Sequence, residues 1–257
     1  MAHLKVLRGY EGTPKVRGFF NSIQGKFKDG KLKSTFFKFK NPIDYQIKNV
    51  EGVDIFYKEA GQKTKPSLVL LHGFSTSSYF YNDLINRLSN EYHIIAPDYP
   101  GFGDSEKPSF TDFEYTLENY AKIFSNLLSD LNIRNYSLYL MDSGIPLGLY
   151  MENLYPEKIK SLIIQSDCSH KDVSEACRNL LYSFWKNKVI QNKVKVLDNS
   201  LCVDGSNLQC YYEGFKSNSS TTDNFGLDLR HLWLYNIGDI NLALFYDYQN
   251  FLKMSHY

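Results

Sequence analysis

Residues 136–148 read Tyr-Ser-Leu-Tyr-Leu-Met-Asp-Ser-Gly-Ile-Pro-Leu-Gly. An apolar run of strand character leads directly into Asp142, and a helix is predicted from Pro146 to about Tyr155. A strand-to-helix turn this sharp lifts the residue at its apex out of the sheet and needs small neighbours, because the two backbone arms pass closely. Gly144 meets that need, whereas Leu140 stands where a small residue is usual. The positive end of the helix would stabilise an anion at the apex.

This segment resembles the nucleophile elbow of α/β-hydrolases, and Asp-Ser-Gly at 142–144 is most similar to the elbow of the haloalkane dehalogenase and epoxide hydrolase branch, where an aspartate attacks carbon. The resemblance implies that Asp142 is the nucleophile. A shifted frame would make Ser143 the nucleophile, but it places the bulky Ile145 where space is short. A third interpretation is that Asp142 only caps the following helix.

Two further motifs resemble the same family. The apolar run 67–71 is predicted as a buried parallel strand that feeds His72-Gly73-Phe74. This tripeptide resembles the oxyanion-hole loop, which implies that the backbone N–H groups of Phe74 and Ser143 stabilise developing negative charge. Residues 98–105, Asp-Tyr-Pro-Gly-Phe-Gly-Asp-Ser, match every fixed position of the family's Asp-x-Pro-Gly-x-Gly-x-Ser turn, whose role is structural. A phosphate-binding loop is excluded, since the third glycine and the following helix start are missing.

Strand-like and helical segments alternate along the chain. We expect a hairpin over 44–57 with its turn at Glu51-Gly52, strands at 67–71, 93–98, 136–141 and 161–165, and helices at 78–88 and 113–130. The alternation predicts an α/β fold: an α/β-hydrolase-like, mostly parallel sheet flanked by helices. From Cys168 onward aromatic helical segments resemble the family's helical cap. The predicted domains are a basic N-terminal extension at 1–42, the core at 43–167 and the cap-like region at 168–257.

Composition indicates a globular chain, with 257 residues, 43% hydrophobic and 22% charged. The net charge of +1 is unevenly distributed: residues 1–42 carry ten Lys or Arg against two acidic residues, which leaves 19 basic and 26 acidic residues in the remainder. We interpret 1–42 as a solvated extension, with an acidic-partner or membrane-surface patch and an organelle-targeting leader as other readings. Nucleic-acid binding is not expected.

The four cysteines, Cys168, Cys177, Cys202 and Cys210, match no zinc or redox spacing and are interpreted as reduced thiols. No metal or cofactor is expected. No run is apolar enough to span a membrane and no signal-peptide core is found, so the predicted location is cytoplasmic, with organelle targeting left open.

The catalytic histidine of the family lies on a loop after two further strands beyond the cap, and this sequence reaches Tyr257 in cap-like helix. The C-terminal part of the core is therefore expected to be missing, with an exposed sheet edge. His170, His231 and His256 follow the elbow, but each is interpreted as a cap residue, so no catalytic base is identified. The explanations that remain are an incomplete gene product, a degenerate pseudoenzyme and a chain completed by another polypeptide.

The resemblance implies a hydrolase of small apolar electrophiles, such as alkyl halides, epoxides or esters, that acts through an aspartyl ester on Asp142. Without a base the ester should form and turnover should stall, so we expect the chain to be impaired or inactive. The alternative is a non-catalytic pseudoenzyme that binds a ligand or protein partner.

Overall fold

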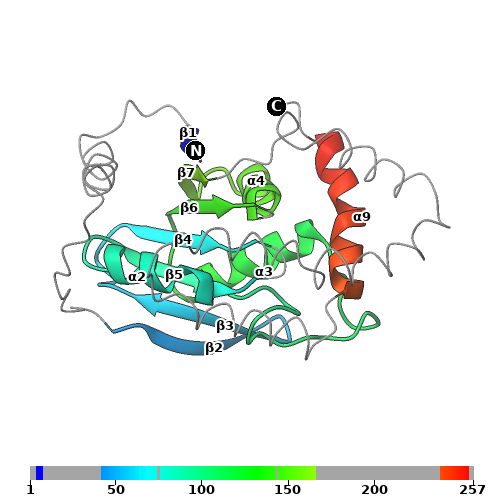
Figure 1. The fold of residues 1–257 in the computed structure, drawn as a ribbon, viewed down its shortest axis with the longest axis horizontal. Coiled ribbons are helices and arrows are strands. Elements are labelled where there is room, and N and C mark those ends of the chain that lie inside the picture. Colours follow the sequence, from blue (N-terminus) through cyan, green and yellow to red (C-terminus); the bar gives the residue numbers. More distant parts are fainter. Residues whose placement is uncertain (1–3, 8–41, 74–75, 143, 166–237, 255–257) are drawn as a thin grey trace, which may run out of the picture.

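The computed structural model describes residues 4–7, 42–73, 76–142, 144–165 and 238–254 (Figure 1). Several predictions lie outside these residues: those for Phe74, Ser143, the four cysteines, the three downstream histidines and most of the cap-like region. The domain boundaries remain predictions for the same reason.

Within the described residues, seven strands form one sheet in the order β1-β7-β6-β4-β5-β3-β2. The four central strands, β5, β4, β6 and β7, run parallel, while β2, β3 and β1 pair antiparallel with their neighbours. This confirms the predicted mostly parallel sheet. The strands are β1 (Leu4–Leu7), β2 (Asp44–Val50), β3 (Val53–Ala60), β4 (Ser67–Leu71), β5 (His93–Pro97), β6 (Tyr136–Met141) and β7 (Ile159–Gln165).

The helices cover both faces of this sheet: η1 (Ser78–Tyr81) and α2 (Asn82–Leu88) lie on one face, and α3 (Leu117–Asp130) and α4 (Gly144–Leu154) on the other (Figure 1). Helix α9 (Gly238–Met254) contacts α3 and α4 beyond the ends of the strands (Figure 1). Strand β4 needs cover on both faces, because its apolar side chains alternate between them. Val69 and Leu71 pack in the core under α3 and α4, while Leu68 and Leu70 pack under α2.

The predicted hairpin is confirmed, since β2 pairs with β3 along its whole length. The turn residues Glu51 and Gly52 have φ values of 52° and 89°. Two consecutive positive φ angles are what a two-residue turn between right-handed-twisted strands requires, and glycine tolerates them without steric cost.

The predicted start of the helix 113–130 is wrong, because α3 begins at Leu117. Thr116 caps it by accepting a hydrogen bond from the Asn119 backbone N–H at 3.2 Å. Phe113 and Tyr115 are buried in the segment before it. Helix α4 also begins earlier than predicted, at Gly144 instead of Pro146.

Helix α9 docks on the N-terminus of α3. Asp247 accepts a hydrogen bond from the Leu117 backbone N–H at 2.7 Å, so a carboxylate from a distant segment satisfies a helix-end donor and faces the positive end of the helix dipole. Ile240 and Leu244 of α9 are fully buried in the core.

Replacing Asp247 with alanine should lower the free energy of unfolding by about 1 kcal/mol, because Leu117 loses its acceptor. Urea unfolding at pH 7 measures this change. Asp247→Asn is the matched variant: it keeps an oxygen acceptor and loses only the charge, so it should retain part of the stabilisation. Equal stability of wild type and Asp247→Ala would contradict this role.

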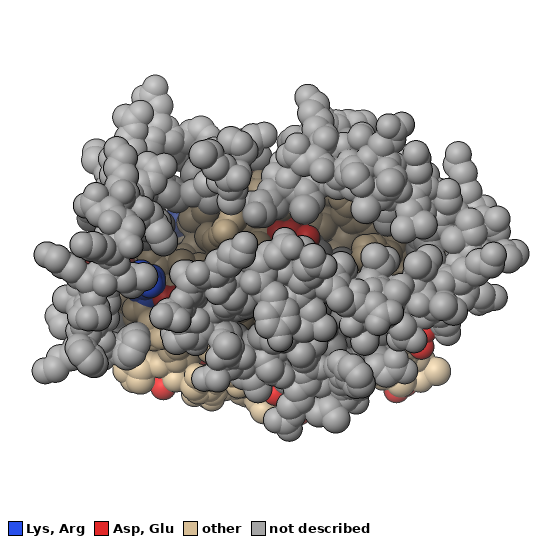
Figure 2. Space-filling view, viewed as in Figure 1, with Lys and Arg blue, Asp and Glu red and all other residues tan. Residues whose placement is uncertain are grey.

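The edge beyond β7, which the sequence led us to expect open, is covered by β1. Leu4 pairs with Gln165 and Leu7 with Leu162 in antiparallel register. The expectation was wrong because it assumed that residues 1–42 lie apart from the sheet. At the opposite edge, the β2 side chains of Tyr45 and Ile47 are exposed. The described residues visible along this lower edge are mostly uncharged (Figure 2).

Candidate active site

Asp142 occupies the apex between β6 and α4, where the sequence placed it. Its φ angle is 50°, a left-handed conformation that is uncommon outside glycine and recurs at functional sites. Its backbone carbonyl accepts a hydrogen bond from the Ile145 N–H at 3.0 Å, which begins α4, while its side chain is exposed. The turn therefore presents a carboxylate to solvent at the N-terminal end of a helix.

Two glycines let the end of β4 approach this apex. A Cβ on Gly73 would lie 2.8 Å from Asp142 Oδ2, and a Cβ on Gly144 would lie 2.5 Å from the Leu71 carbonyl oxygen and 3.0 Å from that of His72. The His-Gly loop is thus beside the carboxylate, as its motif predicted. The two predicted N–H donors, Phe74 and Ser143, lie outside the described residues.

Leu140, the unexpected bulky residue before the apex, is accommodated by Gly148. The Leu140 side chain is fully buried, and a Cβ on Gly148 would overlap its methyl carbons. The space that a small strand residue usually leaves is supplied here by the facing helix.

His72 supports the His-Gly loop, and its ring is not placed to act as a general base in this site. Its ring is fully buried and stacks on Tyr99 with 3.8 Å between ring centroids. Nδ1 lies 2.7 Å from the Gly73 carbonyl oxygen, and Nε2 lies 3.3 Å from the Tyr99 backbone nitrogen, from which it accepts. Burial lowers the pKa of His72 to about 4, so the ring is neutral near pH 7, with its one proton on Nδ1.

The turn at 98–105 is structural, as expected. Asp98 accepts hydrogen bonds from the backbone N–H groups of Ser78 at 2.6 Å and Asp104 at 2.8 Å, which ties the turn to the start of η1. Burial raises the pKa of Asp98 to about 6. Ser105 donates to the Asp98 carbonyl at 2.8 Å and accepts from the Phe56 N–H at 2.9 Å.

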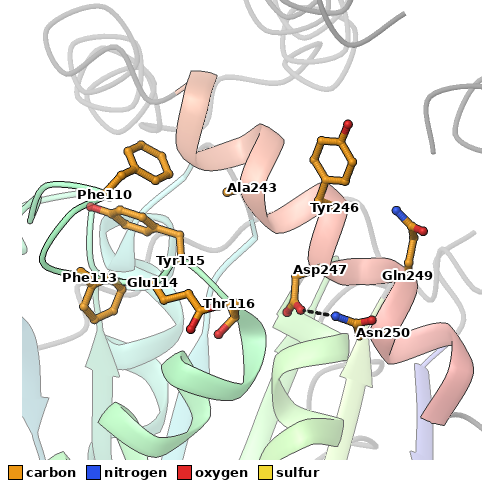
Figure 3. Close-up of a pocket in the computed structure, with 10 residues that line it drawn as sticks. All are labelled: Phe110, Phe113, Glu114, Tyr115, Thr116, Ala243, Tyr246, Asp247, Gln249 and Asn250. Atoms are coloured by element: carbon orange, nitrogen blue, oxygen red, sulfur yellow. Dashed lines mark hydrogen bonds between the residues drawn. The ribbon is translucent and has the colours of Figure 1, made fainter. Parts of the chain in front are cut away.

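A cavity of about 490 Å³ lies away from this apex, between α9 and the segment before α3 (Figure 3). Aromatic and polar side chains line it: Phe110, Phe113, Glu114, Tyr115, Thr116, Ala243, Tyr246, Asp247, Gln249 and Asn250. Asp142 is not among these residues, so this cavity does not bring a ligand to the candidate nucleophile.

The described part of the chain offers few other side chains that could bind a metal ion or act as a base. It contains no group of three or more His, Cys, Asp or Glu side chains that could hold a metal ion, and none of its helices is long and apolar enough to cross a membrane. Two of the six histidines are described, and the second, His93, lies buried with Nε2 2.6 Å from Glu59 Oε1.

Sequence reasoning missed two residues beside the apex, Tyr81 and Tyr99. Their hydroxyl groups donate to the Leu71 and His72 carbonyl oxygens at 2.7 Å and 2.6 Å. The available signal was weak, because tyrosine is abundant in this chain, with 20 residues, and a buried phenol has no characteristic spacing.

Comparison with known proteins gives consistent matches. Residues 66–195 match the family described as having the α/β hydrolase fold. A protein of Saccharomyces cerevisiae named as an uncharacterized hydrolase is 30% identical over 82% of this chain and 73% of its own length. The haloalkane dehalogenase of Agrobacterium fabrum is 36% identical over 37% of this chain and 30% of its own length.

A solved structure has the same fold over most of the chain. A loop variant of a haloalkane dehalogenase from Bradyrhizobium elkanii has a TM-score of 0.60 and 23% identity, and the match covers 80% of this chain and 68% of that one. At this identity the likeness concerns the fold alone.

Proposed function

The chain belongs to the α/β-hydrolase fold family, and from that premise we propose that it attacks small apolar electrophiles through Asp142. Alkyl halides, epoxides and esters are the substrate classes. The observation that carries the proposal is the position of Asp142, exposed on a left-handed turn between β6 and α4 and against Gly73. Support for the alkyl halide class comes from the similarity to a haloalkane dehalogenase.

In the first step one Asp142 carboxylate oxygen forms a bond to the electrophilic carbon, and the leaving group departs with the electron pair of the broken bond. For an alkyl halide the products are an ester on Asp142 and a halide ion; for an epoxide the ring oxygen leaves as an alkoxide that must gain a proton. For an ester, attack on the acyl carbon leaves a mixed anhydride on Asp142 and releases an alkoxide that must also gain a proton. The backbone N–H groups of Phe74 and Ser143 would hold the negative charge that develops on the ester oxygen when water attacks.

The second step, hydrolysis of this ester, needs a base that removes a proton from water. Both described histidines are buried and hydrogen-bonded, and neither suits that role. The chain spans 73% of the yeast relative and 30% of the bacterial dehalogenase. We therefore propose that Asp142 performs ester formation, and that turnover needs a base that lies outside the described residues, in this chain or in a complementing chain.

Incubation with 1-bromohexane or a terminal epoxide tests the proposal. Intact mass should show one added alkyl group, and peptide mapping should place it on Asp142. Asp142→Asn should abolish the adduct, whereas Asp112→Asn, which removes an exposed carboxylate from a surface turn, should not. A folded wild-type sample without an adduct, or an adduct that persists in Asp142→Asn, would overturn the proposal and favour the non-catalytic alternative.

A further inference from the structure

Two buried phenols end on consecutive backbone carbonyls beside the apex. Tyr81 donates to the carbonyl of Leu71, the last residue of β4, and Tyr99 donates to that of His72. The Tyr81 and Tyr99 side chains come from different elements, η1 and the turn after β5, and both rings are at most 1% exposed. Two side-chain donors from separate segments of the chain therefore bind the end of β4.

The same two carbonyl oxygens face the start of α4. A Cβ on Gly144 would lie 2.5 Å from the first and 3.0 Å from the second, so there is little free space between the β4 end and the helix. One residue further along, Gly73 lies against the Asp142 carboxylate. A movement of the Leu71 and His72 carbonyls would shift Gly73, and with it the wall beside the nucleophile.

Tyr99 makes further contacts with the same loop. Its ring stacks on His72, and its backbone N–H donates to His72 Nε2 at 3.3 Å. Burial raises the pKa of both phenols well above the usual value. The two hydroxyl groups therefore stay protonated and remain hydrogen-bond donors.

We propose that Tyr81 and Tyr99 are positioning residues: their hydroxyl groups fix the end of β4, and thereby hold Gly73 in place beside the attacking carboxylate of Asp142. This inference rests on the proposed function of Asp142. Neither phenol touches the reacting carbon; each acts through the backbone that it supports.

Tyr99→Phe and Tyr81→Phe test this inference, because each keeps the buried ring and removes one hydroxyl. Tyr120→Phe is the matched control: Tyr120 is equally buried, contacts the Tyr99 ring and donates to a backbone carbonyl, that of Pro100, at 2.7 Å. All three variants lose one hydrogen bond from a buried phenol, so similar decreases in Tm are expected.

The maximal rate of Asp142 alkylation should distinguish the two test variants from the control. With 1-bromohexane at increasing concentration, Tyr99→Phe should lower the maximal rate roughly 10- to 100-fold with little change in the half-saturating concentration, because a misplaced reacting group loses rate more than binding. Tyr81→Phe should show a smaller decrease, and Tyr120→Phe should stay within about 2-fold of wild type. Equal maximal rates in Tyr99→Phe and Tyr120→Phe would overturn the inference.

Amide hydrogen exchange supplies a readout that does not need alkylation. Peptides covering residues 68–73 should exchange faster in Tyr99→Phe than in wild type and Tyr120→Phe. If wild type forms no adduct, the proposed function fails while this measurement still tests the support of the β4 end. Unchanged exchange over residues 68–73 in Tyr99→Phe would overturn the positioning role.

Discussion

Replacing Gly144 with alanine is expected to lower the free energy of unfolding by about 3 kcal/mol. The added Cβ would lie 2.5 Å from the Leu71 carbonyl oxygen and 3.1 Å from its carbonyl carbon. Both atoms belong to the backbone of a central strand, where Leu71 pairs with Leu140 of β6, so no rotamer change relieves the overlap. The helix or the strand must move, although alanine itself favours helix. Urea unfolding at pH 7 measures the loss.

Gly148→Ala is the matched control on the same helix. Its Cβ would meet the ends of the Leu140 side chain, which can adjust, so the net cost should be about 1 kcal/mol. Adding Leu140→Ala should relieve the overlap, and the double variant should be more stable than the sum of the two single changes predicts. If Gly144→Ala is no less stable than Gly148→Ala, the close approach of α4 to β4 is not a steric limit.

Removing Asp98 is expected to make the protein lose stability steeply between pH 6.5 and 4. The folded-state pKa of His72, about 4, lies below its ordinary value of 6.5, so on acidification the unfolded chain binds the proton first and the folded state loses up to about 3 kcal/mol. Burial raises the Asp98 pKa above its ordinary value of 3.8, so the folded state binds that proton first and gains stability on acidification. In wild type these two contributions oppose each other.

Urea unfolding at pH 4.5, 5.5 and 6.5 reveals the two contributions separately. Relative to wild type, Asp98→Asn should lose more stability on acidification, and His72→Gln should lose less or gain. The comparison uses slopes, since both variants also lose hydrogen bonds at every pH. The Glu59 carboxyl, whose pKa is lowered by its contacts with His93 and Lys63, adds the same background to all three proteins. Parallel pH profiles would contradict the assigned pKa shifts.

Much of the fold could be predicted from local sequence signals. Short apolar runs predicted β4, β5, β6 and β7, and the Glu-Gly pair predicted the β2–β3 turn. These signals are local, because burial and backbone conformation are encoded within each segment. The start of α3 was misplaced since Phe113 and Tyr115 are buried outside a helix, although Thr116 carried a capping signal. Strand β1 was missed because four residues have no periodicity and its partner is distant in sequence.

The candidate site was predicted in part. Asp142 and the His-Gly loop stand together as their motifs indicated, because a strand-to-helix turn and a loop from the adjacent parallel strand meet at the same end of a sheet. The roles of Tyr81, Tyr99 and Gly148 could not be read from the chain. Each depends on a contact between elements, and a hydroxyl that meets a carbonyl across the fold has no local signature.

The pairing of β1 with β7 also sets an order for biosynthesis. Leu7 and Leu162 lie opposite each other in the sheet, yet more than 150 residues separate them. At ~5–20 residues per second, a ribosome needs roughly 10 to 30 s to make the chain between them. Strand β1 therefore emerges long before its partner and must wait unpaired, and the sheet can be closed at this edge only after β4, β5 and β6 have left the tunnel. For a newly made chain, a chaperone that holds the first residues during that interval would protect the strand from pairing with another molecule.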